Sequence, residues 1–142
     1  MVNRWQPEAP RPARVQRRDD NVFVMDEVHG GVGPITMRRY FELGFKWPLE
    51  CEIWDIPVGV TEGPHVHDEV DPDGYVLIDE CYIVLDGQGR FLLADEEIDL
   101  TPGDAIFIDP HTSRGIINTG DSTLRILLLS DLPVQAMPEA SN

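Results

Sequence analysis

The chain has 142 residues, 42% of them hydrophobic, which allows one domain with a modest core and leaves no room for a second. Its formal net charge of −15 argues against binding to nucleic acid or to an anionic membrane surface, because both are negatively charged. No apolar run approaches a membrane span, and no apolar signal segment follows the N-terminal arginines. We therefore expect a cytoplasmic protein whose Cys51 and Cys81 stay reduced.

The N-terminal segment differs in charge from the rest of the chain. Up to residue 18 it contains five arginines, one glutamate and three prolines. A basic tail of this kind is either an interaction arm or a solvated segment, and the prolines favour the second. We predict a disordered basic leader over residues 1–20, one β domain over 21–132 and a flexible C-terminal tail over 133–142.

Three short segments rich in β-branched and aromatic residues begin the domain. The segments 22–28 and 35–41 flank a Gly-rich turn that begins at His29, which we expect to be a turn residue. The segment 49–58 alternates polar and apolar side chains with period two, which is typical of a strand with one buried face. These patterns predict three β-strands.

Residues 75–85 form the longest strand candidate. A turn at Asp86 to Gly89 follows it, and further strand candidates come after that turn, at 90–94, 98–100, 105–108, 114–118 and 123–130. Turn signals recur every eight to twelve residues, and no segment has helical periodicity of useful length. The pattern predicts an all-β fold, either a sandwich or a barrel.

Two histidines one residue apart, His65 and His67, are the first candidate metal ligands. Side chains alternate faces along a strand, so residues two apart project to the same side and both imidazoles reach one ion. Glu80 supplies a carboxylate from another strand, and this completes a three-ligand set with positions left for water or substrate. The alternative is a pair of surface histidines on a hairpin.

Glu80 shares its strand face with Ile78, Tyr82 and Val84, which form a mostly apolar wall with one phenol. Such a wall suits a small pocket around a metal, whereas core packing does not explain a carboxylate, because burying it unpaired is costly. Cys81 should face away from this wall. We therefore predict Glu80 and Tyr82 as catalytic residues.

These residues carry a resemblance to the cupin superfamily. Gly59, His65-Val66-His67, Glu80 and Gly87 are similar to its first motif. Its second motif is matched by Pro102-Gly103-Asp104, Ala105 to Ile108, Asp109-Pro110 and Asn118-Thr119-Gly120. The match spans about residues 50–130. It implies a single-domain cupin-like (jelly-roll) β-barrel, one divalent metal ion, a small-molecule substrate and a homodimer.

The spacing of the first motif departs from the family pattern. The family places three or four residues between the second histidine and the glutamate, whereas twelve separate His67 from Glu80. These twelve include Asp71-Pro72-Asp73-Gly74, a strong turn sequence. We interpret residues 68–79 as a finger or lid beside the metal whose acids supply a further ligand. The alternative is a solvated acidic loop.

The second motif has Arg114 where the family has its histidine ligand. If strand alternation holds, Arg114, Ile116 and Asn118 face the barrel interior. A guanidinium does not ligate a metal but does clamp a carboxylate or phosphate. Three alternatives follow, in order of preference. Arg114 anchors an anionic substrate above a three-ligand metal; Arg114 pairs with Glu80 and replaces the ion; or His111 is the missing ligand.

The predicted metal ligands are accordingly His65, His67, Glu80 and His111, and the predicted catalytic residues are Arg114, Tyr82 and Glu80. Two histidines and a carboxylate resemble the facial triad of non-heme Fe(II) enzymes, and the same set holds Zn²⁺, Mn²⁺ or Ni²⁺ as a Lewis acid. We expect a metal-dependent enzyme acting on a small organic acid or related metabolite, with oxygenase chemistry slightly favoured over lyase or isomerase chemistry. The alternatives are a metal-free cyclase or isomerase and a non-catalytic small-molecule-binding cupin.

Overall fold

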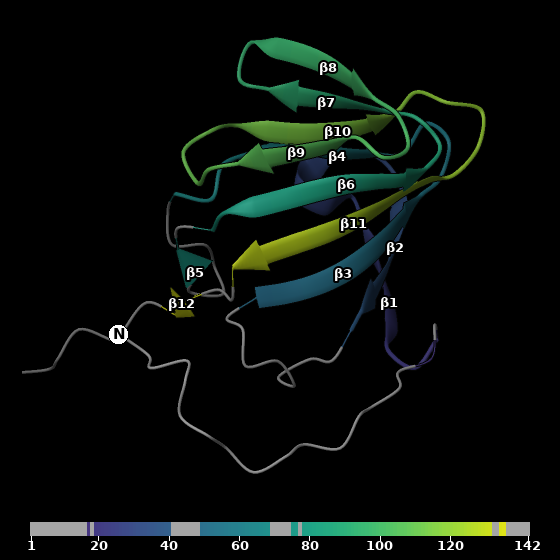
Figure 1. The fold of residues 1–142 in the computed structure, drawn as a ribbon, viewed down its shortest axis with the longest axis horizontal. Helices are drawn as coiled ribbons and strands as arrows, with labels where there is room; N and C mark the ends of the chain where they lie inside the picture. The colour runs from purple at the N-terminus through teal and green to yellow at the C-terminus, as the bar shows by residue number, and fades with distance from the viewer. Residues whose placement is uncertain are drawn as a thin grey trace, which may run out of the picture.

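Two antiparallel sheets, packed face to face, make up most of the computed structural model (Figure 1). The structure describes residues 17, 19–40, 49–68, 75–76, 78–131 and 134–135. The larger sheet has the strand order β1 (Val22–Asp26), β2 (Pro34–Arg39), β3 (Leu49–Ile56), β11 (Leu124–Asp131), β6 (Glu80–Asp86) and β9 (Ala105–Ile108). The smaller has the order β4 (Thr61–His65), β10 (Arg114–Asn118), β7 (Gly89–Leu93) and β8 (Glu96–Leu100).

Two short elements complete the described fold. A three-residue 3₁₀ turn, η1 (Val28–Gly30), joins β1 to β2. A two-stranded pairing joins β12 (Val134–Gln135) to β5 (Tyr75–Val76). Within the described ranges, no helix is long and apolar enough to cross a membrane.

The core lies between the two sheets and follows from strand alternation. Along β11 every second side chain is buried, which places Leu124, Ile126 and Leu128 on the inner face. On the smaller sheet, Phe91 and Ile116 lie opposite each other on β7 and β10 and are fully buried. Inner positions of both sheets belong to one apolar cluster. The all-β jelly-roll prediction is therefore confirmed.

The predicted long strand over residues 75–85 is wrong in one respect, because the structure divides it into β5 and β6. Between them, the Ile78 N–H donates to the carbonyl of His67, and the Asp79 N–H donates to the Asp131 carboxylate. These two N–H groups therefore take no part in the hydrogen bonds between paired strands. The proposed lid falls largely on residues 69–74 and 77, which lie outside the described residues.

Strand alternation places the key side chains as predicted. Glu80, Tyr82 and Val84 are buried on the inner face of β6, and Cys81 faces the other way. Arg114, Ile116 and Asn118 are buried along β10.

Candidate metal centre

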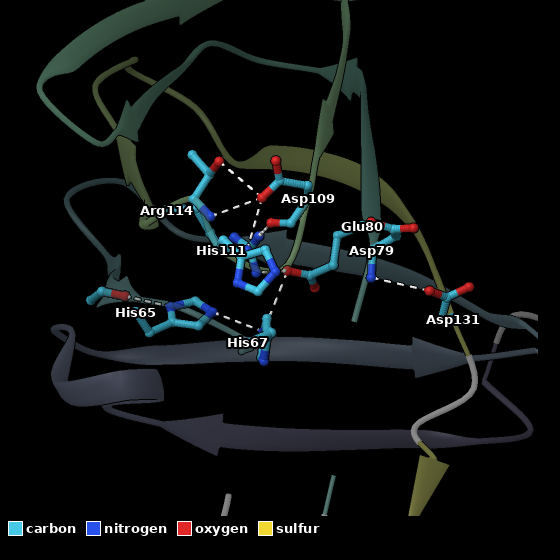
Figure 2. Close-up of polar contacts among 10 residues, drawn as sticks. His65, His67, Asp79, Glu80, Asp109, His111, Arg114 and Asp131 are labelled. Carbon is cyan, nitrogen blue, oxygen red and sulfur yellow. Dashed lines mark hydrogen bonds and ion pairs between the residues drawn. The ribbon is translucent and has the colours of Figure 1, made fainter. Parts of the chain in front are cut away.

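Three predicted ligands converge at one end of the barrel (Figure 2). His65 ends β4, His67 follows it by two residues, and Glu80 begins β6 on the facing sheet. His65 Nε2 lies 3.1 Å from His67 Nε2, which in turn lies 3.4 Å from Glu80 Oε1. Ligand atoms that each lie about 2.1 Å from one ion are roughly 3.0–3.4 Å apart at octahedral or tetrahedral angles. Each of these two separations matches that of neighbouring ligands on one divalent ion, with His67 as the residue common to both pairs.

The backbone orients His65 for ligation. Its Nδ1 lies 2.8 Å from the carbonyl oxygen of Gly63, and an Nδ1–H donating there leaves the Nε2 lone pair directed at His67. Burial lowers the pKa of His65 to about 4, and the nearby His29 and His67 rings also lower it, although the Gly63 bond opposes them. His65 is therefore neutral at pH 7, which is the form that binds a metal.

A third histidine, His29, joins this pair. Its ring stacks on that of His65, with the centroids 3.6 Å apart and the planes 11° apart, and it meets His67 edge-on at 5.8 Å. The candidate ligand nitrogens of the three histidines all lie within 4.8 Å of one another. The sequence predicts His29 only as a turn residue, because the local pattern gives no information on which distant residue it contacts.

Two glycines bring the His29 turn against β4. A Cβ added at Gly31 would lie 2.0 Å from the Thr61 carbonyl oxygen, and one at Gly63 would lie 2.1 Å from the carbonyl oxygen of His29. Only glycine permits backbones to approach this closely. His29 itself has φ 50°, a left-handed conformation that turns the chain toward β4. The position of His29 therefore depends on two glycines far apart in the sequence.

Arg114 lies beside the ligand cluster with its side chain 0% exposed. It stands opposite His65 in the β10–β4 register, its Nη1 lies 3.2 Å from Glu80 Oε1, and its Nη2 donates to the backbone carbonyl of Asp109. The Arg114–Glu80 contact that the second alternative requires is therefore present. Glu80 is shared, however, because His67 contacts the same oxygen.

Glu80 stays ionised in this setting. Burial favours its neutral form, but the hydrogen bond and charge of His67, together with the charge of Arg114, lower its pKa below the usual value. An ionised carboxylate near the neutral imidazole of His65 is a donor set that suits a divalent cation. The residues therefore fit the metal that the sequence motif implies, and this nitrogen and oxygen set accommodates Fe, Zn, Mn or Ni.

His111 lies apart from the three-histidine cluster. Its side chain is 71% exposed, and its Nδ1 faces Asp68 Oδ2 at 3.6 Å. The turn that carries it is fixed by the Asp109 carboxylate, which accepts hydrogen bonds from the backbone N–H groups of His111 and Thr112. The other predicted catalytic residue, Tyr82, is fully buried between the rings of Trp54 and Phe91.

Glu62 is a further buried acid, which the sequence pattern does not predict. It lies on β4, opposite Ile116 of β10, and is 1% exposed. Burial raises its pKa well above the usual value and the charge of Glu80 raises it further, although Arg114 acts in the opposite direction. In the sequence, Glu62 appears as one polar residue in a short segment rich in glycine and proline, which gives no signal of burial.

The jelly roll and its histidine cluster define a cupin-type barrel with a candidate metal centre. The family model for the Cupin domain matches residues 52–130, which is more than half of the chain, so the chain belongs to this family.

Among known proteins, the chain is 38% identical over 78 residues to an uncharacterized protein, MJ1618, of Methanocaldococcus jannaschii. This match covers 55% of the chain and only 56% of the relative. A crystal structure of a predicted oxalate decarboxylase from Thermotoga maritima matches with a TM-score of 0.69 and 25% identity, over 84% of this chain and 99% of that one. The polyketide cyclase RemF from Streptomyces resistomycificus matches with a TM-score of 0.67 and 20% identity, over 90% and 89% of the chains.

Proposed function

We propose that this protein is a metal-dependent enzyme that acts on a small organic acid. The observation that supports this proposal most is that ligand nitrogens of His29, His65 and His67 lie within 4.8 Å of one another, with Glu80 Oε1 3.4 Å from His67 Nε2. A buried guanidinium lies 3.2 Å from the same Glu80 oxygen. In this proposal His65, His67 and Glu80 hold the ion, and His29 is a further ligand from the adjoining turn. A bound divalent ion would supply Lewis-acid or redox chemistry.

Arg114 is the residue that we assign to the acid itself. Its Nε is buried and has no hydrogen-bond partner among the described residues, while its Nη1 lies 3.2 Å from Glu80 Oε1. Buried guanidinium N–H groups without acceptors are costly, and a carboxylate supplies acceptors with complementary charge. In the proposed complex, Arg114 holds the carboxylate of the substrate below the metal ligands.

The reaction type is a finer proposal. The Thermotoga neighbour at 25% identity is described as a predicted oxalate decarboxylase. That description supports a small carboxylic acid as substrate and favours lyase chemistry, which reverses the order expected from the sequence. Decarboxylation breaks a carbon–carbon bond, releases CO₂ and leaves the electron pair to be protonated, whereas an oxygenase consumes O₂.

One experiment tests the proposal. The full chain, purified without a histidine tag, is analysed for bound metals and then assayed with a panel of small mono- and dicarboxylic acids, oxalate included, for CO₂ release and O₂ uptake. We expect about one divalent metal per chain and turnover of at least one acid. A metal-loaded protein that neither binds nor converts any acid of the panel would contradict the proposal.

A metal-free cupin is the second candidate, and the 3.2 Å contact between Arg114 and Glu80 favours it. In that case the guanidinium takes the place of the ion as the partner of Glu80. The same metal analysis separates the two, because a metal-free protein stays free of metal after incubation with Fe²⁺, Mn²⁺, Zn²⁺ or Ni²⁺. Arg114→His would then create the missing histidine ligand and confer metal binding.

The expected homodimer remains a prediction. It is supported by the outer face of the larger sheet, where Cys51, Leu129, Cys81 and Phe107 stand in one cross-strand row and Phe107 is 67% exposed. An apolar row of this kind favours burial against a second copy. Light scattering on the wild type and on Phe107→Asp checks this, since the variant should be monomeric.

A further inference from the structure

The barrel interior contains a second group of polar atoms below the candidate metal ligands. They are Oε1 of Glu62, the hydroxyl of Tyr82 and Nε of Arg114, which are buried without a hydrogen-bond partner among the described residues. The three side chains come from β4, β6 and β10, so both sheets contribute. Buried polar atoms without partners are rare in folded proteins, which makes several of them in one region informative.

The three side chains form one electrostatic cluster. The charges of Glu80 and Arg114 act on both Glu62 and Tyr82, and Tyr82 is also close to Glu62. The register supports this proximity, because Glu62 stands opposite Ile116, two residues from Arg114 on the inner face of β10. Phe91, which packs edge-on against Tyr82, and Ile116 fill the neighbouring interior, so a ligand group in this region is small.

The charges of the region determine what Glu62 offers a ligand. Glu80 is ionised and contacts Arg114, so the single guanidinium already has an anionic partner. A second ionised carboxylate in the apolar interior would lack a cation, and the neutral acid is favoured. A neutral carboxyl group has one O–H donor and an acceptor oxygen. Glu62 thus adds a donor that an ionised carboxylate does not have.

Building on the proposed function, we propose that Glu62, Tyr82 and Arg114 form one buried subsite for a small acid that carries oxygen on the carbon next to its carboxylate. Arg114 donates to the carboxylate, while Glu62 and Tyr82 hydrogen-bond the neighbouring hydroxyl or carbonyl oxygen. The subsite therefore selects 2-hydroxy and 2-oxo acids over unsubstituted acids of the same length. Glu62 is its specificity-determining residue.

The test compares glycolate with acetate, which lacks the hydroxyl, by calorimetric titration of the full chain loaded with Zn²⁺. Three variants are measured beside the wild type: Glu62→Gln, which keeps a donor and an acceptor; Glu62→Leu, which removes both; and Glu96→Gln, an exposed control on β8. We expect glycolate to bind the wild type at least about tenfold more tightly than acetate. That preference should persist in both Gln variants and fall below about twofold in Glu62→Leu, with acetate affinity and zinc content unchanged.

An equal preference for glycolate in Glu62→Leu would overturn the inference, because chelation by the metal alone would then explain it. Infrared spectroscopy gives a readout independent of binding. At pH 7 a protonated-carboxyl band should be present in the wild type and in Glu96→Gln but absent in Glu62→Gln. Its absence from the wild type would also overturn the inference, even if Glu62→Leu does not fold.

The two proposals fail in different ways. A zinc-loaded protein that binds neither acid would contradict the proposed function and this inference together. A protein that binds both acids without any dependence on Glu62 would contradict the subsite alone.

Discussion

The two halves of the candidate site differ in their exposure to solvent and in how their polar atoms are paired. In the outer half, which consists of His29, His65 and His67, the rings are partly exposed and their nitrogens lie within 4.8 Å of one another. His67 also lies 3.4 Å from Glu80. In the inner half, which consists of Glu62, Tyr82 and Arg114, the side chains are fully buried and several polar atoms have no hydrogen-bond partner among the described residues. The outer half brings candidate metal ligands together, whereas the inner half offers hydrogen bonds that the described protein atoms do not take up.

This difference indicates which residues determine binding of the metal and which determine selectivity among acids. An unsatisfied buried polar group costs roughly 1–3 kcal/mol, so the inner half lowers the stability of the unliganded fold. A ligand that satisfies these groups recovers that energy on binding. The outer half should therefore control metal content and the inner half the choice of acid, and mutations should separate the two.

The largest expected effect comes from the outer half. Replacing both His65 and His67 with Ala removes two of the proposed ligands, so metal affinity should fall by at least about 100-fold and the purified variant should contain almost none. Elemental analysis and zinc titration measure this. His111→Ala is the matched control, since its ring is exposed and faces Asp68, and it should keep its metal. Stoichiometric metal in the double variant would remove the basis for the site.

The inner half gives the next largest effect. Arg114→Gln should retain the metal but weaken binding of a small carboxylate such as oxalate by about 2–4 kcal/mol, the scale of losing a buried charge-assisted pair. Calorimetry with the metal-loaded variant measures the loss. If metal affinity instead rises sharply in Arg114→Gln, the arginine competes with the ion for Glu80.

The metal-free protein should lose stability in acid through His65. Its folded pKa of about 4 lies below its ordinary value, so between about pH 6.5 and pH 4 the unfolded chain binds a proton that the folded chain does not. Stability therefore falls as the pH drops through this window, by up to about 3 kcal/mol, and the contribution is constant above it. Urea unfolding of the wild type and of His65→Gln after metal removal measures the difference, because glutamine at position 65 binds no proton in this pH range. An unchanged pH slope in His65→Gln would contradict the assignment.

The smallest effect concerns His29. Because its ring is the most exposed of the three, His29→Ala should reduce metal affinity by about 10–100-fold, less than the loss of both other histidines. Gly31→Ala should have a similar effect with all ligands intact, since a Cβ there collides with the Thr61 carbonyl and displaces the turn. Metal titration of both variants measures this. Wild-type affinity in both would place His29 outside the site.

Much of the fold and part of the site could be predicted from local pattern. Alternation predicted the inner faces of β6 and β10, and with them the burial of Glu80, Tyr82 and Arg114. These predictions succeed because the two-residue period of a strand fixes side-chain direction locally. The pairing of His65 with His67 follows from the same period.

The remaining features depend on contacts between distant segments. His29 reaches His65 because Gly31 and Gly63 allow two backbones to touch, and no local pattern reports that approach. The break in the 75–85 segment arises where the Ile78 N–H bonds the carbonyl of His67 instead of a strand partner. Glu62 is buried by the facing sheet, which its short segment does not reveal.

The central claim is that a divalent ion is shared by His65, His67 and Glu80, with His29 beside them. A crystal structure of the full chain grown with Zn²⁺, with anomalous data collected on both sides of the zinc absorption edge, tests this most directly. We predict one strong anomalous peak about 2.1 Å from Nε2 of His65 and His67, with Glu80 and His29 completing the coordination. A zinc peak at His111 with Arg114 turned to solvent, or no peak near the histidines while Arg114 pairs with Glu80, would contradict the account.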